Sequence, residues 1–580
     1  MDNQKQPVEK NRAWYLGNTT VREAQRLRAG LTALAGSPLE GNLDGRERER
    51  AFAILLSDAE VVRIQRGPEE DFSDMGRKWR AAMMQLGFIT PNSERLAEND
   101  LSRVVPFSIT ENGRRLIDST SLPAQQECFL RSLLALQLPS PVESFPAAAP
   151  FSPLRIVLDI LCGLEESGAE ANVSKAEMAA VVEVTTSSAD VPVAVERIIR
   201  FREAMTNAAN QPKRNEIERT FLGTGNASQK PETLMDYADS NFRYLRLTGL
   251  FRQEKNRLGR APHRRTLIDA ILATPFQPSD GKAYLERFWK GAEIPTDNRA
   301  TAVAEIHEAA RALESTGVKV TVPADLDQLG VADVHRILHD FEEQLVRTRE
   351  RAYANEQRNQ WDNITEYLDG LIADSRFIPS KEAPAYFEWA IWRAFLAINS
   401  LVNEPWECRN FEVYEGPQPY ESFLPVGCAR SGSPDLVFEF ENFALVVEVT
   451  LSSSSRQEAA EGEPVRRHVA VLSDVFAAKK KPVYGLFLAL TVDTNTAETF
   501  RVAKWYRKDD SELALKIVPL TLRQFANLFS APNAAKGALD PKLIEDLLRD
   551  CLAELNSPAP AWKSAINERV DRFVTGRLST

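Results

Sequence analysis

The sequence predicts a multidomain α+β protein with a mixed N-terminal half, a helical linker and a C-terminal α/β domain that contains a mixed sheet. Its length of 580 residues exceeds what one hydrophobic core serves, so we expect three or four domains. Amphipathic helix patterns fill residues 297–375, and strand patterns between helices follow residue 380. With 43% hydrophobic and 26% charged residues, the composition is globular, which excludes disordered, collagen-like and coiled-coil proteins.

The sequence contains no apolar run that approaches the roughly 18 to 20 residues of a membrane span. The first residues, MDNQKQPVEKNRAW, lack the apolar core of a signal peptide. We therefore expect a soluble, cytoplasmic protein without a membrane partner. An odd number of cysteines without a CxxC pair favours reduced thiols over disulfides or a zinc site. These cysteines are Cys128, Cys162, Cys408, Cys428 and Cys551.

Basic residues are concentrated in one segment, although the whole chain carries a net charge of −11. Between residues 243 and 265, eight Lys or Arg residues face a single acid, Glu254, and aromatic residues lie among them. Such a segment is typical of a surface that contacts a phosphate backbone, and the alternative is a solvated basic face. The residues that we expect to contact DNA are Arg243, Arg246, Arg252, Lys255, Arg257, Arg264 and Arg265.

The layout of this segment occurs twice in the chain. Around residues 79–118 and again around 241–270, a helix ends near a glycine (Gly87, Gly249), two short strands follow, and a new helix opens near an Arg-Arg pair. A helix followed by a β-wing is the second half of a winged helix. We therefore expect winged-helix-like DNA-recognition subdomains at 1–140 and 150–285, separated by a Pro-rich stretch. The alternative is that both wings serve only for packing.

Residues 286–378 form the predicted helical linker, because apolar residues recur there at three- and four-residue spacing between dense charges. His335 and His339 have the i, i+4 spacing of a metal site, but no motif acid or third ligand accompanies them. We interpret them as ordinary histidines on a helix face.

The C-terminal domain, residues 379–580, contains two acids where acids are costly. The stretch PDLVFEFENFALVVEVTL predicts two strands joined by a tight turn near Glu441, with Asp435 at the start of the first and Glu448 near the end of the second. Two carboxylates that converge across a hairpin repel one another, and a divalent cation relieves this repulsion. Hard oxygen ligands predict Mg²⁺, with Mn²⁺ as a substitute. The alternative is an acid at the sheet edge that pairs with a nearby arginine.

Pro434-Asp435, twelve intervening residues and then Glu448-Val449-Thr450 resemble the PD-(D/E)xK nuclease motif, with Thr450 in place of the usual lysine. The flanking segments FEWAIWRAF and EGEPVRRH extend this resemblance to the AlwI-like family of type IIS restriction and nicking endonucleases. The resemblance implies winged-helix recognition modules, a helical linker and a C-terminal PD-(D/E)xK nuclease domain.

The resemblance also implies roles for single residues. Asp435 and Glu448 would hold the metal, with the Val449 carbonyl as a further ligand, and Glu388 would approach it from the side. Glu461 and His468 match an additional acid and a histidine of the family. Without the lysine, either His468 or the metal itself would activate the attacking water. Arg430, Arg466 and Arg467 are candidate phosphate clamps or solvated surface.

The function implied is a sequence-specific, Mg²⁺-dependent endonuclease that binds double-stranded DNA and cuts to one side of an asymmetric site. One alternative is a strand-specific nicking enzyme, or a large subunit that needs a small catalytic partner or transient homodimer for the second strand. A non-enzymatic alternative is a winged-helix regulator with an inactive nuclease-fold domain. The sequence does not predict the recognition site, because base choice depends on side-chain placement in a groove.

Overall fold

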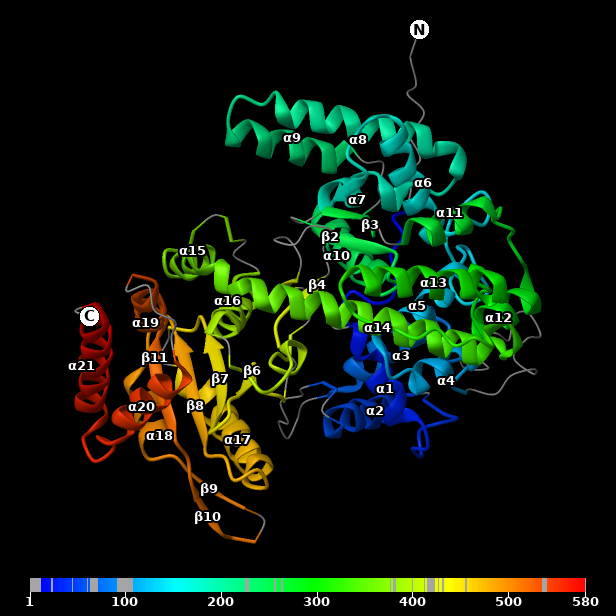
Figure 1. Cartoon of the computed structure of the whole chain (residues 1–580). Coiled ribbons are helices and arrows are strands. Elements are labelled where there is room, and N and C mark those ends of the chain that lie inside the picture. Colours follow the sequence, from blue (N-terminus) through cyan, green and yellow to red (C-terminus); the bar gives the residue numbers. More distant parts are fainter. Residues whose placement is uncertain are drawn as a thin grey trace. The chain divides into compact units, whose positions relative to one another are not determined.

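The computed structural model describes residues 12–21, 24–43, 45–59, 61–62, 71–90, 108–224, 229–254, 257–261, 264–375, 377–378, 382–398, 400–411, 413–414, 423–425, 427–429, 432–453, 456–507, 509–534 and 540–578. The chain forms two compact units, Met1–Leu345 and Val346–Thr580. The long helix α14 (Val331–Glu356) contains the boundary between them (Figure 1). Each unit mixes helices and strands, as the sequence predicts. The finer division into four domains stays a prediction.

The first unit is mainly helical. Its helices before α14 are α1 (Leu27–Leu34), α2 (Arg46–Asp58), α3 (Ser73–Gln85), α4 (Glu111–Asp118), α5 (Leu122–Ala135), α6 (Pro153–Glu166), α7 (Lys175–Ala180), α8 (Val191–Thr206), α9 (Gln211–Thr224), α10 (Pro231–Arg246), α11 (Arg265–Ala273), α12 (Gly281–Lys290) and α13 (Arg299–Ser315). Its strands are β1 (Asn172–Ser174), β2 (Phe251–Glu254) and β3 (Arg257–Arg260), which form an antiparallel sheet in the order β1-β3-β2.

The two helix-and-wing patterns differ in how far the structure describes them. After α10, Gly249 adopts a φ of +71°, which favours glycine, and turns the chain into the hairpin β2–β3, as the sequence predicts. After α3, Gly87 adopts a φ of +70° in the same way. There the described residues contain only an isolated antiparallel bridge between Ile89 and Ile109, and the rest of that wing lies outside the described residues.

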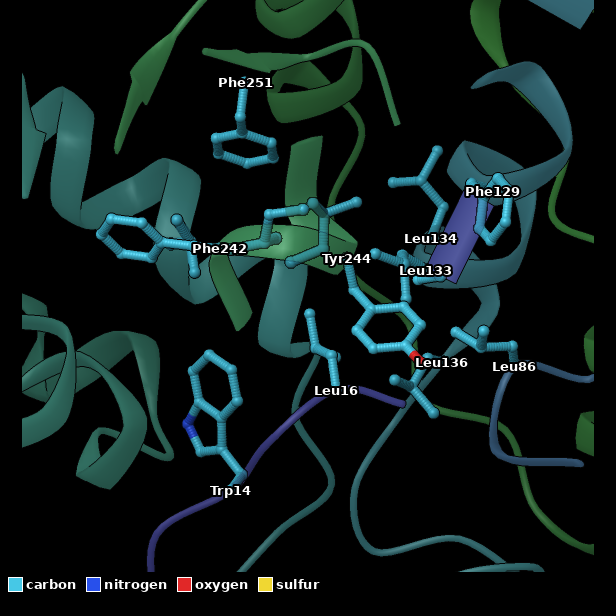
Figure 2. Packing of buried hydrophobic residues seen from close by; sticks show 14 of the residues in the cluster. Trp14, Leu16, Leu86, Phe129, Leu133, Leu134, Leu136, Phe242, Tyr244 and Phe251 are labelled. Carbon is cyan, nitrogen blue, oxygen red and sulfur yellow. The ribbon is translucent and has the colours of Figure 1, made fainter. Parts of the chain in front are cut away.

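Both predicted recognition subdomains share one hydrophobic core, which includes residues from Ala13 to Ile294. Figure 2 shows Phe129 of α5 and Tyr244 of α10 in this core. The N-terminal segment packs across α10, where the Leu16 N–H donates to Asn241 Oδ1 at 2.8 Å and the Asn18 N–H donates to the Tyr244 hydroxyl at 3.3 Å. This segment therefore covers one face of α10.

The histidines of α14 contact a buried acid of α5. His335 Nδ1 and His339 Nε2 lie 3.3 and 2.8 Å from Glu127 Oε2, and Arg131 Nε donates to Glu127 Oε1 at 2.7 Å. Burial opposes ionisation of Glu127, but these histidines and Arg131 together lower its pKa. Arg131 also pairs with Asp297, so one guanidinium is shared between two acids. The cluster is therefore an internal ion-pair network, and both histidines lie on the face of α14 that contacts it.

The second unit is built on a four-stranded mixed sheet with the strand order β11-β8-β7-β6 (Figure 1). Its strands are β4 (Val413–Tyr414), β5 (Leu424–Pro425), β6 (Leu436–Glu439), β7 (Ala444–Thr450), β8 (Val483–Ala489), β9 (Lys504–Tyr506), β10 (Glu512–Ala514) and β11 (Ile517–Thr521). Its helices after α14 are α15 (Trp361–Ile372), α16 (Ala383–Ile398), α17 (Gln457–Ala477), α18 (Thr494–Arg501), α19 (Leu522–Ala534), α20 (Pro541–Leu552) and α21 (Ala559–Leu578).

The sheet agrees with the sequence prediction in its main features. β6 and β7 form the predicted hairpin, and the apolar β7 lies inside the sheet, antiparallel to β6 and parallel to β8. β8 and β11 pair in parallel. Helix α15, which the sequence assigns to the linker, instead packs on α16 and α19 within the second unit. Its residues Ile364 and Leu368 are fully buried there, because they belong to the core of this unit.

Two further sequence expectations can be compared with the structure. All five cysteines are free thiols. Among the described residues, no helix combines the length and the apolar character that crossing a membrane requires.

Candidate active site

The β6–β7 hairpin brings Asp435 and Glu448 to the same end of the sheet. Leu436 pairs with Val447 across the hairpin, so Asp435, one residue before β6, lies beside Glu448 on β7. The Val449 N–H donates to Asp435 Oδ2 at 2.8 Å, which holds this carboxylate against the adjacent strand. The sequence spacing of these two acids thus corresponds to spatial proximity.

Glu388 reaches the same region from helix α16, where its side chain is buried. The Ala429 N–H donates to Glu388 Oε2 at 2.5 Å. Burial raises the pKa of Glu388 well above its usual range, and the negative charge of Asp435 raises it further. Glu388 and Asp435 therefore lie close enough to interact electrostatically.

The pKa of Asp435 is also raised well above its usual range. Burial is the main cause, and the charges of Glu448 and then Glu461 add to it, whereas the hydrogen bond from Val449 opposes the shift. Glu461 lies on α17, one face of which packs on β7 and β8. Four carboxylates therefore interact within one small region, which is costly for the protein without a counter-charge.

His468 contacts this group directly. It lies on α17 together with Glu461, is buried, and places its Nδ1 2.5 Å from Glu448 Oε1. Thr450, which stands where the motif has lysine, accepts a hydrogen bond from the Ser452 N–H at 3.2 Å through its hydroxyl. The structure thus brings the predicted histidine to the predicted acid, and it turns Thr450 toward the backbone at the end of β7.

The donor set suits a hard divalent cation, because it consists of carboxylate oxygens whose mutual repulsion a positive charge would relieve. Within the described part of the chain, however, no three His, Cys, Asp or Glu side chains are already arranged as a closed metal-binding group. The metal ligands Asp435, Glu448 and Val449 therefore stay a prediction.

The arginines near the motif have mixed surroundings. Arg467 donates from Nη1 to the Gly432 carbonyl at 3.4 Å, in the loop before Pro434, and pairs with Glu463. Arg466 donates from Nε to the carbonyl of Gly462 at 3.0 Å, and Arg430 lies outside the described residues. Arg467 is thus the described arginine of this set that borders the motif loop.

Several basic residues expected to contact DNA are engaged inside the first unit. Arg257 Nη2 lies 2.6 Å from Glu177 Oε2, and the Glu177 side chain is fully buried. Arg264 pairs with Glu342 of α14. Arg243, in the last turn of α10, pairs with Asp239 at 3.2 Å and donates to the Thr19 carbonyl at 3.4 Å. These three side chains serve internal contacts.

The remaining members of the set differ in exposure. Arg246 on α10 and Arg252 on β2 are half-buried, and Lys255 lies outside the described residues. Arg265 at the start of α11 keeps 67% of its side chain exposed, and its nearest carboxylate, Glu165, is 3.6 Å away. Of the six residues of this set that the structure describes, only Arg265 is thus classed as exposed.

One residue beside the candidate active site is not indicated by any sequence pattern. Asn410 donates from its side-chain nitrogen to the Pro434 carbonyl, and its own N–H donates to the Asp435 carbonyl at 3.1 Å. The contact joins segments 24 residues apart that have no regular spacing, so the sequence offers no signal for it.

Comparison with known families decides the family to which this chain belongs. The sequence matches the AlwI restriction endonuclease family over residues 84–528, which is well over half of the chain. The chain belongs to this family. The predicted resemblance is thereby confirmed, and membership supports a restriction enzyme, that is, a site-specific nuclease that binds DNA.

Other comparisons find only distant likenesses. No curated protein matches the chain. The small subunit of the heterodimeric restriction endonuclease R.BspD6I is 22% identical, with a TM-score of 0.28 over 36% of this chain and 97% of that one. The BpuJ1 endonuclease binding domain, solved with pyrene- and phenanthrene-modified DNA, is 14% identical, with a TM-score of 0.33 over 50% of this chain and 99% of that one. Both TM-scores are too low to support a statement about this chain.

Proposed function

We propose that this member of the AlwI family is a Mg²⁺-dependent type IIS endonuclease that hydrolyses a phosphodiester to one side of an asymmetric DNA site. The observation that carries the proposal is the interacting group Glu388, Asp435 and Glu448, in which burial and like charges raise the pKa values of Glu388 and Asp435. Such groups are typical of catalytic sites, since a structural role would be better served by neutral side chains.

In this proposal, Asp435 and Glu448 hold Mg²⁺ or Mn²⁺, with the Val449 carbonyl as a further ligand. The ion, when bound, polarises the phosphate, offsets the charge that develops on it and lowers the pKa of the attacking water. The Val449 N–H orients Asp435, and His468 orients Glu448 through their 2.5 Å contact. The PD-(D/E)xK arrangement of the nuclease domain is part of the same proposal.

His468 is the side chain proposed to accept the proton of the attacking water, and the alternative is activation by the bound metal alone. His468 is close enough to the carboxylates to serve as the base, because it contacts Glu448 directly. Glu388 and Glu461 belong to the same electrostatic group and would shape the field around the scissile phosphate. Thr450 carries no titratable group, so it cannot replace the lysine of the motif as a base.

DNA recognition is assigned in this proposal to winged-helix-like modules of the first unit. The element order α6, β1, α7, α10, β2 and β3, with the sheet order β1-β3-β2, supports a winged helix into which α8 and α9 are inserted. Arg265 is the residue whose exposure best supports a phosphate contact. Double-stranded DNA is then the partner of this unit.

The second candidate function is a strand-specific nicking endonuclease, or a large subunit that works with a small catalytic subunit or a transient homodimer. It is favoured because the described residues contain one group of interacting catalytic-type carboxylates, and one centre cuts one strand at a time. The non-enzymatic alternative, a winged-helix regulator, would not require Glu388, Asp435 and Glu448 to interact.

The test is cleavage of supercoiled plasmid by the full chain with Mg²⁺, with Mn²⁺ and with EDTA, followed by run-off sequencing of the products. We expect cleavage with either metal, none with EDTA, and a fixed one-sided distance between site and cut. Asp435→Asn and Glu448→Gln should abolish cleavage, because each removes a metal ligand, and they should leave DNA binding intact, because the metal ligands lie outside the recognition unit.

Glu441→Gln is the matched control, since Glu441 is an exposed acid at the turn of the same hairpin. It should cleave like the wild type. Full activity of Asp435→Asn or Glu448→Gln would refute the metal site, and an inactive wild type that binds DNA specifically would support the regulator. Linear products would indicate double-strand cutting, whereas persistent nicked circles would indicate the nicking enzyme.

A further inference from the structure

The segment 402–410 covers the outer edge of β6, the strand that Asp435 precedes. The Val402 N–H donates to the Glu439 carbonyl at 2.7 Å, and the Val437 N–H donates to the Cys408 carbonyl at 2.9 Å. Asn403 accepts from the Glu439 N–H at 3.0 Å and donates to the Val437 carbonyl at 2.9 Å. This segment therefore satisfies backbone groups that an edge strand would otherwise leave open.

Asn410 holds the end of this edge that carries the candidate metal ligand. Its Nδ2 donates to the Pro434 carbonyl at 2.5 Å, and its backbone N–H donates to the Asp435 carbonyl at 3.1 Å. These two carbonyls lie on either side of the Asp435 Cα atom. One residue thus fixes the backbone on both sides of Asp435.

The carboxylate of Asp435 is fixed independently from the other strand. The Val449 N–H donates to Oδ2 at 2.8 Å, from β7. With its backbone held by Asn410 and one carboxylate oxygen held by Val449, Asp435 has little freedom to turn. The direction in which the carboxylate faces the other acids therefore depends on both contacts.

Asn410 is itself supported by its neighbour Arg409. The Arg409 guanidinium pairs with the buried Glu350 of α14, with both Nε and Nη2 at 2.9 Å from Oε1, and it donates from Nη1 to the Phe411 carbonyl at 2.7 Å. It also lies 5.6 Å from the centre of the Trp392 ring. This anchoring gives Asn410 a fixed position from which to hold the Pro434–Asp435 backbone.

We propose that Asn410 is a positioning residue, which sets the orientation of Asp435 for metal binding and thereby for phosphodiester hydrolysis. The inference rests on the proposed function, because it assumes that Asp435 binds the metal. Residues that orient metal ligands typically contribute about 10- to 100-fold to metal affinity or activity when they are removed. Asn410 does not touch the metal or the DNA in this role.

The experiment compares full-length Asn410→Ala and Asn410→Asp with the wild type in three measurements: Mn²⁺ binding by calorimetry, plasmid cleavage, and affinity for DNA in EDTA. Asn410→Asp keeps the shape of the side chain but lacks the N–H that the Pro434 carbonyl accepts. The matched control is Asn403→Ala, because Asn403 belongs to the same segment and bonds to the same strand at Val437 and Glu439, away from Asp435.

We expect both Asn410 variants to bind Mn²⁺ about 10- to 100-fold more weakly and to cleave more slowly by a similar factor. The DNA affinity of the Asn410 variants should stay within about twofold of that of the wild type. Asn403→Ala should stay within about threefold of the wild type in all three measurements, even if its melting temperature falls as far as those of the Asn410 variants. Mn²⁺ affinities of the Asn410 variants equal to that of Asn403→Ala, or wild-type behaviour of Asn410→Asp, would overturn the inference.

The two proposals fail in different ways. A wild type that binds Mn²⁺ but cleaves no DNA would refute the nuclease, and the Mn²⁺ affinities would still decide the role of Asn410. A wild type that binds no Mn²⁺ would overturn the positioning role, since Asp435 would then not be a metal ligand.

Discussion

Arg257 has an internal structural contact that its position in a basic segment does not reveal. On β3, it donates to Asn172 and pairs with Glu177, whose side chain is fully buried, while Arg202 binds the other oxygen of Glu177 at 2.9 Å. Burial alone would raise the pKa of Glu177, and the two arginines lower it instead. We therefore predict that Arg257→Met destabilises the first unit.

The size of this effect follows from the contacts. Removing one partner of a buried ion pair costs about 3–5 kcal/mol, because the other charge stays buried. Here Arg202 remains on Glu177, and Arg257 keeps 27% of its side chain exposed, so both factors reduce the loss. We expect a loss of about 2 kcal/mol. At about 2–4 °C for each kcal/mol in a large domain, the melting temperature should fall by about 4–8 °C.

The assay is thermal unfolding of the full chain, followed by the salt dependence of DNA binding at a temperature where both variants are folded. Arg265→Met is the matched control, since Arg265 is 67% exposed and has only distant carboxylate partners. It should unfold within about 1–2 °C of the wild type, because exposed ion pairs contribute little. If Arg265 contacts a phosphate, its variant should lose about one unit of salt slope.

The reasoning would be refuted if Arg257→Met unfolded at the temperature of the wild type, since the Arg257–Glu177 pair would then contribute nothing. A stable Arg257→Met variant with a reduced salt slope would instead assign Arg257 to DNA. Equal destabilisation by Arg257→Met and Arg265→Met would show that the loss does not come from the buried acid.

Three further predictions concern pH and strand cutting. Glu183 is fully buried, which raises its pKa well above its usual range. The free energy of unfolding should therefore fall by about 1.4 kcal/mol for each pH unit between the unfolded and the folded pKa of Glu183. Glu183→Gln should remove this slope when unfolding is measured as a function of pH. Burial lowers the pKa of His335, but the contacts with Glu127 and the Thr296 carbonyl together raise it above its usual value. The stability that His335 provides should thus be complete below about pH 6.5 and be lost as pH rises through its folded pKa; unchanged pH dependence in His335→Gln would contradict this. A time course of supercoiled plasmid should show an open-circular intermediate that persists longer as enzyme is diluted, and direct conversion to linear DNA at every enzyme concentration would contradict cleavage by a monomer with a single centre.

The hairpin of the candidate active site could be predicted from the sequence because its determinants are local. Asp435 directly precedes β6 and Glu448 lies in β7, so the antiparallel pairing of these two strands places both acids at one end of the hairpin. The family resemblance supplied Glu388, Glu461 and His468, which lie on α16 and α17. Spacing alone could not have shown that His468 contacts Glu448, because helix α17 returns to the sheet through tertiary packing.

The surroundings of the basic segment could not be predicted because its partners are distant in the chain. Arg257 pairs with an acid 80 residues earlier, and Arg264 pairs with one 78 residues later. A local excess of arginine counts charges along the chain, whereas DNA binding depends on charges that remain exposed after folding. The acids that pair with these arginines, Glu177 and Glu342, lie outside the basic segment 243–265.

The same physical difference separates the carboxylates of the candidate active site from the arginines. A buried acid that folding leaves among other acids keeps an unfavourable energy, and this residual cost is itself a sign of function, as for Asp435 and Glu388. A half-buried arginine that folding places on a carboxylate, such as Arg257, is compensated by that partner and gives no such sign. In this chain, the acids that the fold buries beside other acids therefore indicate a candidate functional site better than the local excess of arginines in the sequence does.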